Sequence, residues 1–214
     1  MPVATLRRLT LAVGLYAAAS LAHAETWPGA DWAEGAKPAG PAVAALEAYA
    51  FPTRDDVSRK GIRTDALLVI QDGKIIYERY AGPTKASTPH LTWSMSKSLL
   101  AATMGVAYGE GRFKLSDSAA QYYPAFAAHP EIKLGHLFNW ASGLDWQEGY
   151  ELAPVKSSVV AMLYTLGRND MPAFVAGHNG EVPPGTRFRY SSGDSNVLSA
   201  ALKGMLGADV YAQY

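Results

Sequence analysis

Four residues at the start of an apolar segment, Ser94-Met95-Ser96-Lys97, have the types and spacing needed for nucleophilic catalysis. A serine hydroxyl is a weak nucleophile at neutral pH and needs a neighbouring base. Ser94 and Lys97 are three positions apart, so in a helix their side chains share one face. At the start of a buried helix, the helix dipole and desolvation both disfavour a charged lysine. We therefore predict that Ser94 is a nucleophile and Lys97 its base, and that the Ser94 backbone N–H is one oxyanion donor.

A second polar element, Tyr190-Ser191-Ser192, follows 96 residues after Ser94 and precedes another helical segment. A phenol near an ammonium group can relay a proton to a leaving group. The Ser192 hydroxyl could donate a hydrogen bond to a substrate carbonyl or to Lys97. Both elements also have a structural interpretation: Ser-x-x-Lys occurs by chance in chains of this length as a capping serine with a solvated lysine, and Tyr190 could simply pack against a helix cap.

Composition excludes several other functions. The chain has 214 residues, of which 49% are hydrophobic and 18% charged, which is typical of a globular protein with a core. Nineteen basic and 19 acidic residues balance, so no basic field indicates nucleic acid. The absence of cysteine excludes disulfides and thiolate zinc sites. The histidines lack ligand spacing, and no phosphate-binding glycine loop is present, so we expect no metal and no organic cofactor.

The first 24 residues have the pattern of a secretory signal peptide. Arg7 and Arg8 precede an apolar run, Leu9 to Leu21, and Ala22-His23-Ala24 fits the small-x-small cleavage site. The run is shorter than the roughly 20 residues that span a bilayer. The alternatives are an uncleaved anchor or a buried helix. We predict cleavage after Ala24, a periplasmic or secreted bacterial protein, and no stable membrane span after cleavage.

Two runs rich in β-formers, residues 65–71 and 74–80, flank Asp72-Gly73. An Asp-Gly pair tolerates the positive φ angles of a two-residue hairpin turn, so we predict a β-hairpin. The first run is apolar throughout, which predicts a strand covered on both faces. Residues 25–60 are rich in Ala, Pro and Gly, and only Pro41 to Tyr49 has a helical pattern.

Helical patterns dominate after Pro89. The segment from Ser94 to Glu110 is apolar nearly all round, which predicts a buried helix. Further helices are predicted over residues 134–141, closed by Gly143, over 155–166, and over 195–206, with Asp194 as N-cap and Gly207 as the terminating residue.

A lone hairpin is marginal in water, because a stable sheet needs at least three strands. We therefore expect this chain to be the N-terminal part of a longer protein, the alternative being a helical domain decorated by a hairpin. The expected organisation is a signal peptide over 1–24, a segment with the hairpin over 25–90, and a helical domain over 91–214 that carries both polar motifs and is incomplete at its C-terminus.

The motifs together resemble the serine β-lactamase and penicillin-binding-protein superfamily. Trp93 to Ser98 resembles its nucleophile motif, Tyr190-Ser191-Ser192 its second motif, and Asn139 to Trp146 the Ser-Gly-Leu segment between them. The sequence is most similar to the class C-like branch of 6-aminohexanoate-dimer hydrolases and esterases. The resemblance implies an α/β (α+β) fold of β-lactamase/transpeptidase type: an antiparallel sheet flanked by helices, with a helical domain beside it.

The same resemblance implies that Ser94 is acylated, that Lys97 is its base partner and that Tyr190 relays the proton. It implies that Tyr150, in a loop typical of the nylon-oligomer branch, contacts substrate together with Ser192. The family's third motif, on a C-terminal strand, is not found after Ser192. His178-Asn179-Gly180 has suitable letters but precedes Tyr190. We therefore expect the C-terminal strands and a second oxyanion donor to lie beyond Tyr214, and little turnover from this piece alone.

The leading hypothesis is an exported serine hydrolase that cleaves a small-molecule amide or ester through an acyl-enzyme. Alternatives are a non-catalytic penicillin-recognising domain, a class C β-lactamase or D-Ala-D-Ala carboxypeptidase, and a structural domain in which the motifs are coincidental. The Ser-Asp-Asn element of class A β-lactamases is absent, which disfavours that class. The sequence leaves the substrate and the oligomeric state open.

Overall fold

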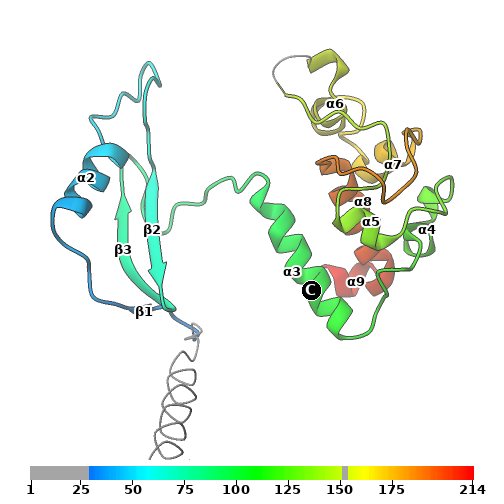
Figure 1. Ribbon diagram of the computed structural model, residues 1–214, viewed down its shortest axis with the longest axis horizontal. Helices are drawn as coiled ribbons and strands as arrows, with labels where there is room; N and C mark the ends of the chain where they lie inside the picture. Colours follow the sequence, from blue (N-terminus) through cyan, green and yellow to red (C-terminus); the bar gives the residue numbers. More distant parts are fainter. Residues whose placement is uncertain (1–28, 151–153) are drawn as a thin grey trace, which may run out of the picture. The chain divides into compact units, whose positions relative to one another are not determined.

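A computed structural model describes residues 29–150 and 154–214, which divide between His90 and Leu91 into two compact units (Figure 1). The signal peptide predicted over residues 1–24 lies outside the described residues. Within those residues, no helix combines the length and the apolar character needed to cross a membrane.

The first unit contains a three-stranded sheet with the order β1-β3-β2, formed by Ala33–Glu34, Ala66–Gln71 and Lys74–Tyr80. The predicted hairpin of β2 and β3 is confirmed and is antiparallel. Asp72 and Gly73 have φ angles of 50° and 70°, as a two-residue turn with positive φ requires. β1 pairs with β3 in parallel, so the sheet is mixed and not wholly antiparallel as expected.

The prediction that the first hairpin strand is covered on both faces is wrong. Leu68 and Ile70 expose 50% and 43% of their surface, whereas Leu67 and Val69 are half-buried. Successive side chains of a strand point to opposite faces, so this alternation marks a sheet with one better-covered face. The apolar sequence of β2 therefore does not mean that both of its faces are buried.

The helix predicted near Pro41 is confirmed as α2, Pro41–Ala50, with proline at its first turn. It lies against β3 (Figure 1). The Tyr77 hydroxyl donates to the Glu47 carboxylate at 2.8 Å, and the Arg79 guanidinium lies 4.2 Å from the centre of the Phe51 ring. One helix thus flanks the sheet through polar and cation–π contacts to a single strand.

The second unit is helical, and α8 lies at its centre, in contact with α3, α4, α5, α6, α7 and α9 (Figure 1). Its elements are α3 (Met95–Gly109), α4 (Ala119–Tyr122), η1 (Pro124–Phe126), α5 (Leu134–Phe138), η2 (Pro154–Lys156), α6 (Ser158–Tyr164), α7 (Met171–Ala176), α8 (Ser192–Leu206) and α9 (Ala208–Tyr211). The apolar face of α8 forms the middle of the core through Val197, Leu198, Ala201 and Leu202.

The helix predicted from Ser94 is present as α3, but the prediction that it is buried is wrong. Met95, Leu99 and Val106 expose 69%, 63% and 56% of their surface, and only Met104 and Ala107 are buried. A helix offers one face to each neighbour, and α3 meets α8 along one face. The second unit therefore covers only part of the apolar surface of α3.

Two other predicted helices begin at different residues. The helix predicted over 155–166 is a short 3₁₀ turn followed by α6, whose start is capped by Ser157 through a hydrogen bond from Val160 N at 3.2 Å. α8 begins three residues earlier than predicted, because Ser191 and not Asp194 is its N-cap. The helix predicted over 134–141 ends at Phe138, while Gly207 terminates α8 as expected.

Gly204 permits the close approach of α8 to α4. A Cβ at this position would lie 1.8 Å from the Tyr122 carbonyl oxygen, whereas a Cβ at Gly105 of α3 would meet nothing within 4 Å. Gly204→Ala is expected to lower the free energy of unfolding by about 1–3 kcal/mol through overpacking. The matched Gly105→Ala is expected to raise it by about 0.5–1 kcal/mol, because alanine is the better helix former. Urea unfolding checks both, and equal effects of the two variants would contradict this account of the helix contact.

Candidate active site

Ser94 is the N-cap of α3, and its side chain meets that of Lys97 one turn later. The Lys97 Nζ lies 3.3 Å from the Ser94 Oγ and donates a hydrogen bond to it. The backbone N–H of Ser94 donates to no acceptor among the described residues. The structure thus places hydroxyl, amine and an open backbone donor together at the start of one helix, the arrangement expected from the three-residue spacing.

The neighbouring Ser96 is engaged differently. Its hydroxyl donates to the Trp93 carbonyl oxygen at 2.7 Å and so closes the first turn of the helix. Trp93, directly before Ser94, has a φ of 46°, an uncommon conformation for a large side chain. The two serines therefore have different partners. The Ser96 hydroxyl bonds to the main chain, and the Ser94 hydroxyl faces Lys97.

Tyr190 reaches the same lysine from the loop before α8. The Lys97 Nζ lies 5.1 Å from the centre of the Tyr190 ring, within the range of a cation–π contact. Trp140 fixes this loop, because its ring centre is 4.5 Å from that of Tyr190 and its carbonyl accepts from Arg189 N at 2.7 Å. The three predicted catalytic residues are therefore brought together, with Lys97 between Ser94 and Tyr190.

Ser192 is the first residue of α8, and its hydroxyl is held by a carboxylate that sequence reasoning did not identify. Glu148 accepts from both the hydroxyl and the backbone N–H of Ser192, the latter at 2.9 Å, and also from the Trp146 indole N–H. The expected donation from Ser192 to a substrate carbonyl or to Lys97 is not what this geometry presents. With its proton committed to Glu148, the Ser192 oxygen is oriented to accept a hydrogen bond.

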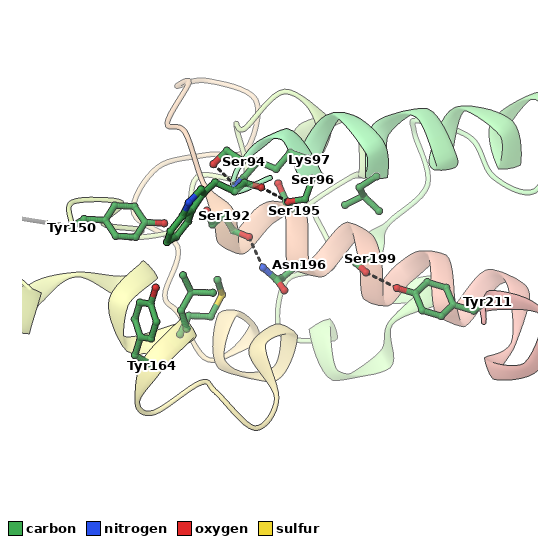
Figure 2. Close-up of a pocket in the computed structure, with 14 residues that line it drawn as sticks. Ser94, Ser96, Lys97, Tyr150, Tyr164, Ser192, Ser195, Asn196, Ser199 and Tyr211 are labelled. Carbon is green, nitrogen blue, oxygen red and sulfur yellow. Dashed lines mark hydrogen bonds between the residues drawn. The ribbon is translucent and has the colours of Figure 1, made fainter. Parts of the chain in front are cut away.

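These groups open onto a cavity of about 560 Å³ between α3, α6 and α8 (Figure 2). Ser94, Lys97, Tyr150 and Ser192 all line it, whereas Tyr190 contacts Lys97 from outside the lining. Tyr150 keeps 43% of its surface exposed. Its remaining burial raises the pKa of the phenol, and the charge of Glu148 raises it further, so the group stays protonated and available as a donor.

A buried carboxyl ties the surrounding loops to the start of α8. Asp194 is shielded from solvent, and its Oδ1 accepts from Ser142 Oγ at 2.8 Å and Ser191 Oγ at 3.0 Å. Its Oδ2 has no hydrogen-bond partner among the described residues. Burial is the main cause that raises the pKa of Asp194 to about 6, against the lowering effect of the two serine hydroxyls.

Two of these residues carried little signal in the sequence. Asp194 was interpreted as an N-cap, although the Ser191-x-x-Asp194 spacing is typical of a serine cap with an acidic residue in the first turn. Ser191 Oγ indeed accepts from Asp194 N at 2.9 Å. Glu148 lies 44 positions before Ser192, and no local spacing connects them. Only the arrangement of the loop in space reveals that contact.

Comparison with known proteins identifies the family. The family described as "Beta-lactamase" matches residues 39–214 of the chain. Among solved structures, "Putative 6-aminohexanoate-dimer hydrolase from Bacillus anthracis" is similar, with a TM-score of 0.59 and 22% sequence identity over 85% of this chain. The chain spans about half of that protein, 49% of its length. No curated protein matches the sequence.

The raised pKa of Asp194 makes stability depend on pH. The folded chain holds this proton more tightly than the unfolded chain, so the stabilisation is complete below about pH 4 and is lost as the pH rises through about 6. Across that window we expect a loss of about 3 kcal/mol in the free energy of unfolding. Asp194→Asn has the same shape and cannot ionise, so the difference between wild type and variant should change by this amount. Unfolding in urea at pH 4 and pH 7 measures it, and a constant difference would refute the assignment.

Proposed function

The chain belongs to the β-lactamase family, and on this premise we propose that it is an exported serine hydrolase that cleaves a small-molecule amide or ester through an acyl-enzyme. The single observation that carries the proposal is the contact of Ser94 Oγ with Lys97 Nζ at the edge of the 560 Å³ cavity. A nucleophile beside a base, opening onto a hollow of small-molecule size, is the minimum that acyl transfer requires.

In the first step the Ser94 oxygen attacks the substrate carbonyl, and its proton passes to the Lys97 side-chain nitrogen. The open Ser94 backbone N–H donates to the oxygen that becomes negative. The carbon–nitrogen or carbon–oxygen bond of the substrate then breaks. The leaving group takes up the proton from Lys97, directly or through the Tyr190 phenol, and the acyl group remains bonded to Ser94.

In the second step water replaces the leaving group. Lys97 accepts a proton from the attacking water, directly or through the Tyr190 phenol, the bond between the acyl carbon and Ser94 Oγ breaks, and the serine recovers its proton. The support for including the phenol is its nearness: the Tyr190 ring centre lies 5.1 Å from Lys97 Nζ. Tyr150 and the oxygen of Ser192 face the cavity as a donor and an acceptor, a pair suited to a substrate amide.

The resemblance to a protein named as a 6-aminohexanoate-dimer hydrolase makes short amides the first substrates to test. β-Lactams and esters are the second group, because a serine that forms acyl-enzymes can react with both. No nucleic acid or metal takes part in this scheme.

Labelling by a fluorophosphonate tests the nucleophile directly, because it needs an activated serine but no completed turnover. We expect one adduct on Ser94 of the full chain and none in Ser94→Ala. Ser96→Ala is the matched control: its hydroxyl lines the same cavity but bonds to the Trp93 carbonyl, so labelling should persist. Lys97→Gln should slow labelling by about 10²-fold or more through loss of the base.

Mass spectrometry of tryptic peptides locates the adduct. Labelling that persists in Ser94→Ala would reject the proposal. An acyl adduct on Ser94 that forms from a β-lactam or ester and is not released would instead favour a non-catalytic recognition domain.

Export is tested at the N-terminus of the product. When the gene is expressed with its own leader in a Gram-negative host, we expect the periplasmic or secreted protein to begin at Glu25. Ala24→Leu places a bulky residue at the cleavage site and should block this processing. N-terminal sequencing of both products is the measurement, and a wild-type product that keeps Met1 would contradict the export proposal.

A further inference from the structure

The loop from Leu144 to Tyr150 carries Glu148 and Tyr150, which lie on the substrate side of the candidate site. In the described part of the chain this loop contains no helix, and its one strand-like contact is the bridge between Leu144 and Gly180. The carbonyl of the buried Trp146 accepts no backbone hydrogen bond from the described residues. A buried carbonyl needs a donor, so a side chain has to supply it.

Arg189 supplies this donor. Its Nη1 donates to the Trp146 carbonyl oxygen at 3.1 Å and contacts the Leu144 carbonyl oxygen at 3.4 Å. The same nitrogen pairs with the Glu181 carboxylate at 2.6 Å, and only 29% of the Arg189 side chain is exposed. One guanidinium group therefore fixes the main chain two residues before Glu148.

The main chain of Arg189 fixes a different part of the site. Its N–H donates to the Trp140 carbonyl oxygen at 2.7 Å, and the next residue is Tyr190. The Tyr190 ring centre lies 4.5 Å from that of Trp140 and 5.1 Å from the Lys97 Nζ. A displacement of Arg189 would therefore move the phenol relative to the amine.

The contact made by the Arg189 side chain continues to the substrate side. The Trp146 indole N–H donates to the Glu148 carboxylate, which also accepts from the N–H and the hydroxyl of Ser192. Tyr150 follows Glu148 by two residues and lines the same cavity as Ser192. Arg189 is thus connected both to the phenol beside the amine and to the groups that face the substrate.

A second arginine shares the carboxylate but not the carbonyls. Arg187 Nη2 lies 2.8 Å from the Glu181 carboxylate, and hydrogen bonds from Arg187 and Arg189 hold the pKa of Glu181 below its usual range. Arg187 forms no hydrogen bond with a loop carbonyl within residues 29–150 and 154–214. The two arginines therefore differ in their contact with the loop, while both pair with the same acid.

We propose that Arg189 is a positioning residue that holds the Tyr190 phenol and the Glu148 carboxylate in one fixed relation. It does so through the two loop carbonyls that its guanidinium contacts. The inference rests on the proposed function for the role of Tyr190 in proton transfer. Without the guanidinium, the two carbonyls lose their donor, and the loop before Glu148 is released from the segment before α8.

Arg189→Gln and Arg187→Gln test this role in the full chain on a 4-nitrophenyl ester and on the 4-nitroanilide of the same acid. The 4-nitrophenolate leaves without a proton, whereas the anilide nitrogen must be protonated, so the anilide depends more on a well-placed phenol. In Arg189→Gln we expect kcat/KM for the anilide to fall by about 10- to 100-fold, as for a misplacement of about 1 Å. The value for the ester should fall much less.

The ratio of the two rates separates positioning from stability, because a smaller fraction of folded enzyme lowers both rates equally. Arg187→Gln loses a contact to the same Glu181 and should keep the wild-type ratio. Arg189→Lys keeps a cation at this place and should recover part of the ratio. An unchanged ratio in Arg189→Gln, with hydrolysis still dependent on Ser94, would overturn the positioning role and leave the proposed function standing.

Fluorine NMR gives a second readout that needs no turnover. In protein labelled with 3-fluorotyrosine, with resonances assigned through Tyr150→Phe and Tyr190→Phe, we expect Arg189→Gln to shift both signals and Arg187→Gln to shift neither. Unshifted signals in Arg189→Gln, or equal shifts in both variants, would overturn the coupling. If the wild type releases neither leaving group, the hydrolase proposal fails, and the fluorine spectra still decide whether Arg189 couples the two tyrosines.

Discussion

The buried carboxyl of Asp194 is the constraint on which the arrangement of the site depends. It accepts from Ser142, in the loop after α5, and from Ser191, the residue directly after Tyr190. One group thereby fixes two separate loops to the start of α8. Burying a carboxyl disfavours its charged form, which is why its pKa rises to about 6. Although a buried carboxyl is destabilising, Asp194 holds Ser191, and with it the neighbouring Tyr190, near Lys97.

Two helix starts meet at the cavity and differ in what occupies them. The N-terminus of α8 is satisfied internally, because the Glu148 carboxylate accepts from the N–H and hydroxyl of Ser192. At the N-terminus of α3, the Ser94 N–H has no acceptor within residues 29–150 and 154–214. Helix N-termini attract negative charge, so the open one is where charge developing on a substrate oxygen would be stabilised. The occupied one instead gives the cavity a fixed acceptor at the Ser192 oxygen.

The features that sequence reasoning predicted are those set by local geometry. Asp72-Gly73 fixed the hairpin turn, and the spacing of Ser94 and Lys97 fixed their contact within one helix turn. The errors arose where packing decides: the apolar surface of α3 and of β2 did not mean burial on all sides, and the two-residue strand β1 had no pattern to detect. The same limit applies to the site, because the contact of Glu148 with Ser192 joins residues 44 positions apart.

The helical period of α8 explains why its core-packing residues and its cavity-lining residues were hard to separate in the sequence. Val197, Leu198, Ala201 and Leu202 are buried in the core, while Ser192, Asn196 and Ser199 line the cavity on the other side. The two sets interleave along the chain, and their mixture resembles an ordinary amphipathic helix. In three dimensions one set forms the centre of the core and the other forms the floor of the cavity. A rigid core helix is a favourable place for such a floor, because packing on one face fixes the polar side chains on the other.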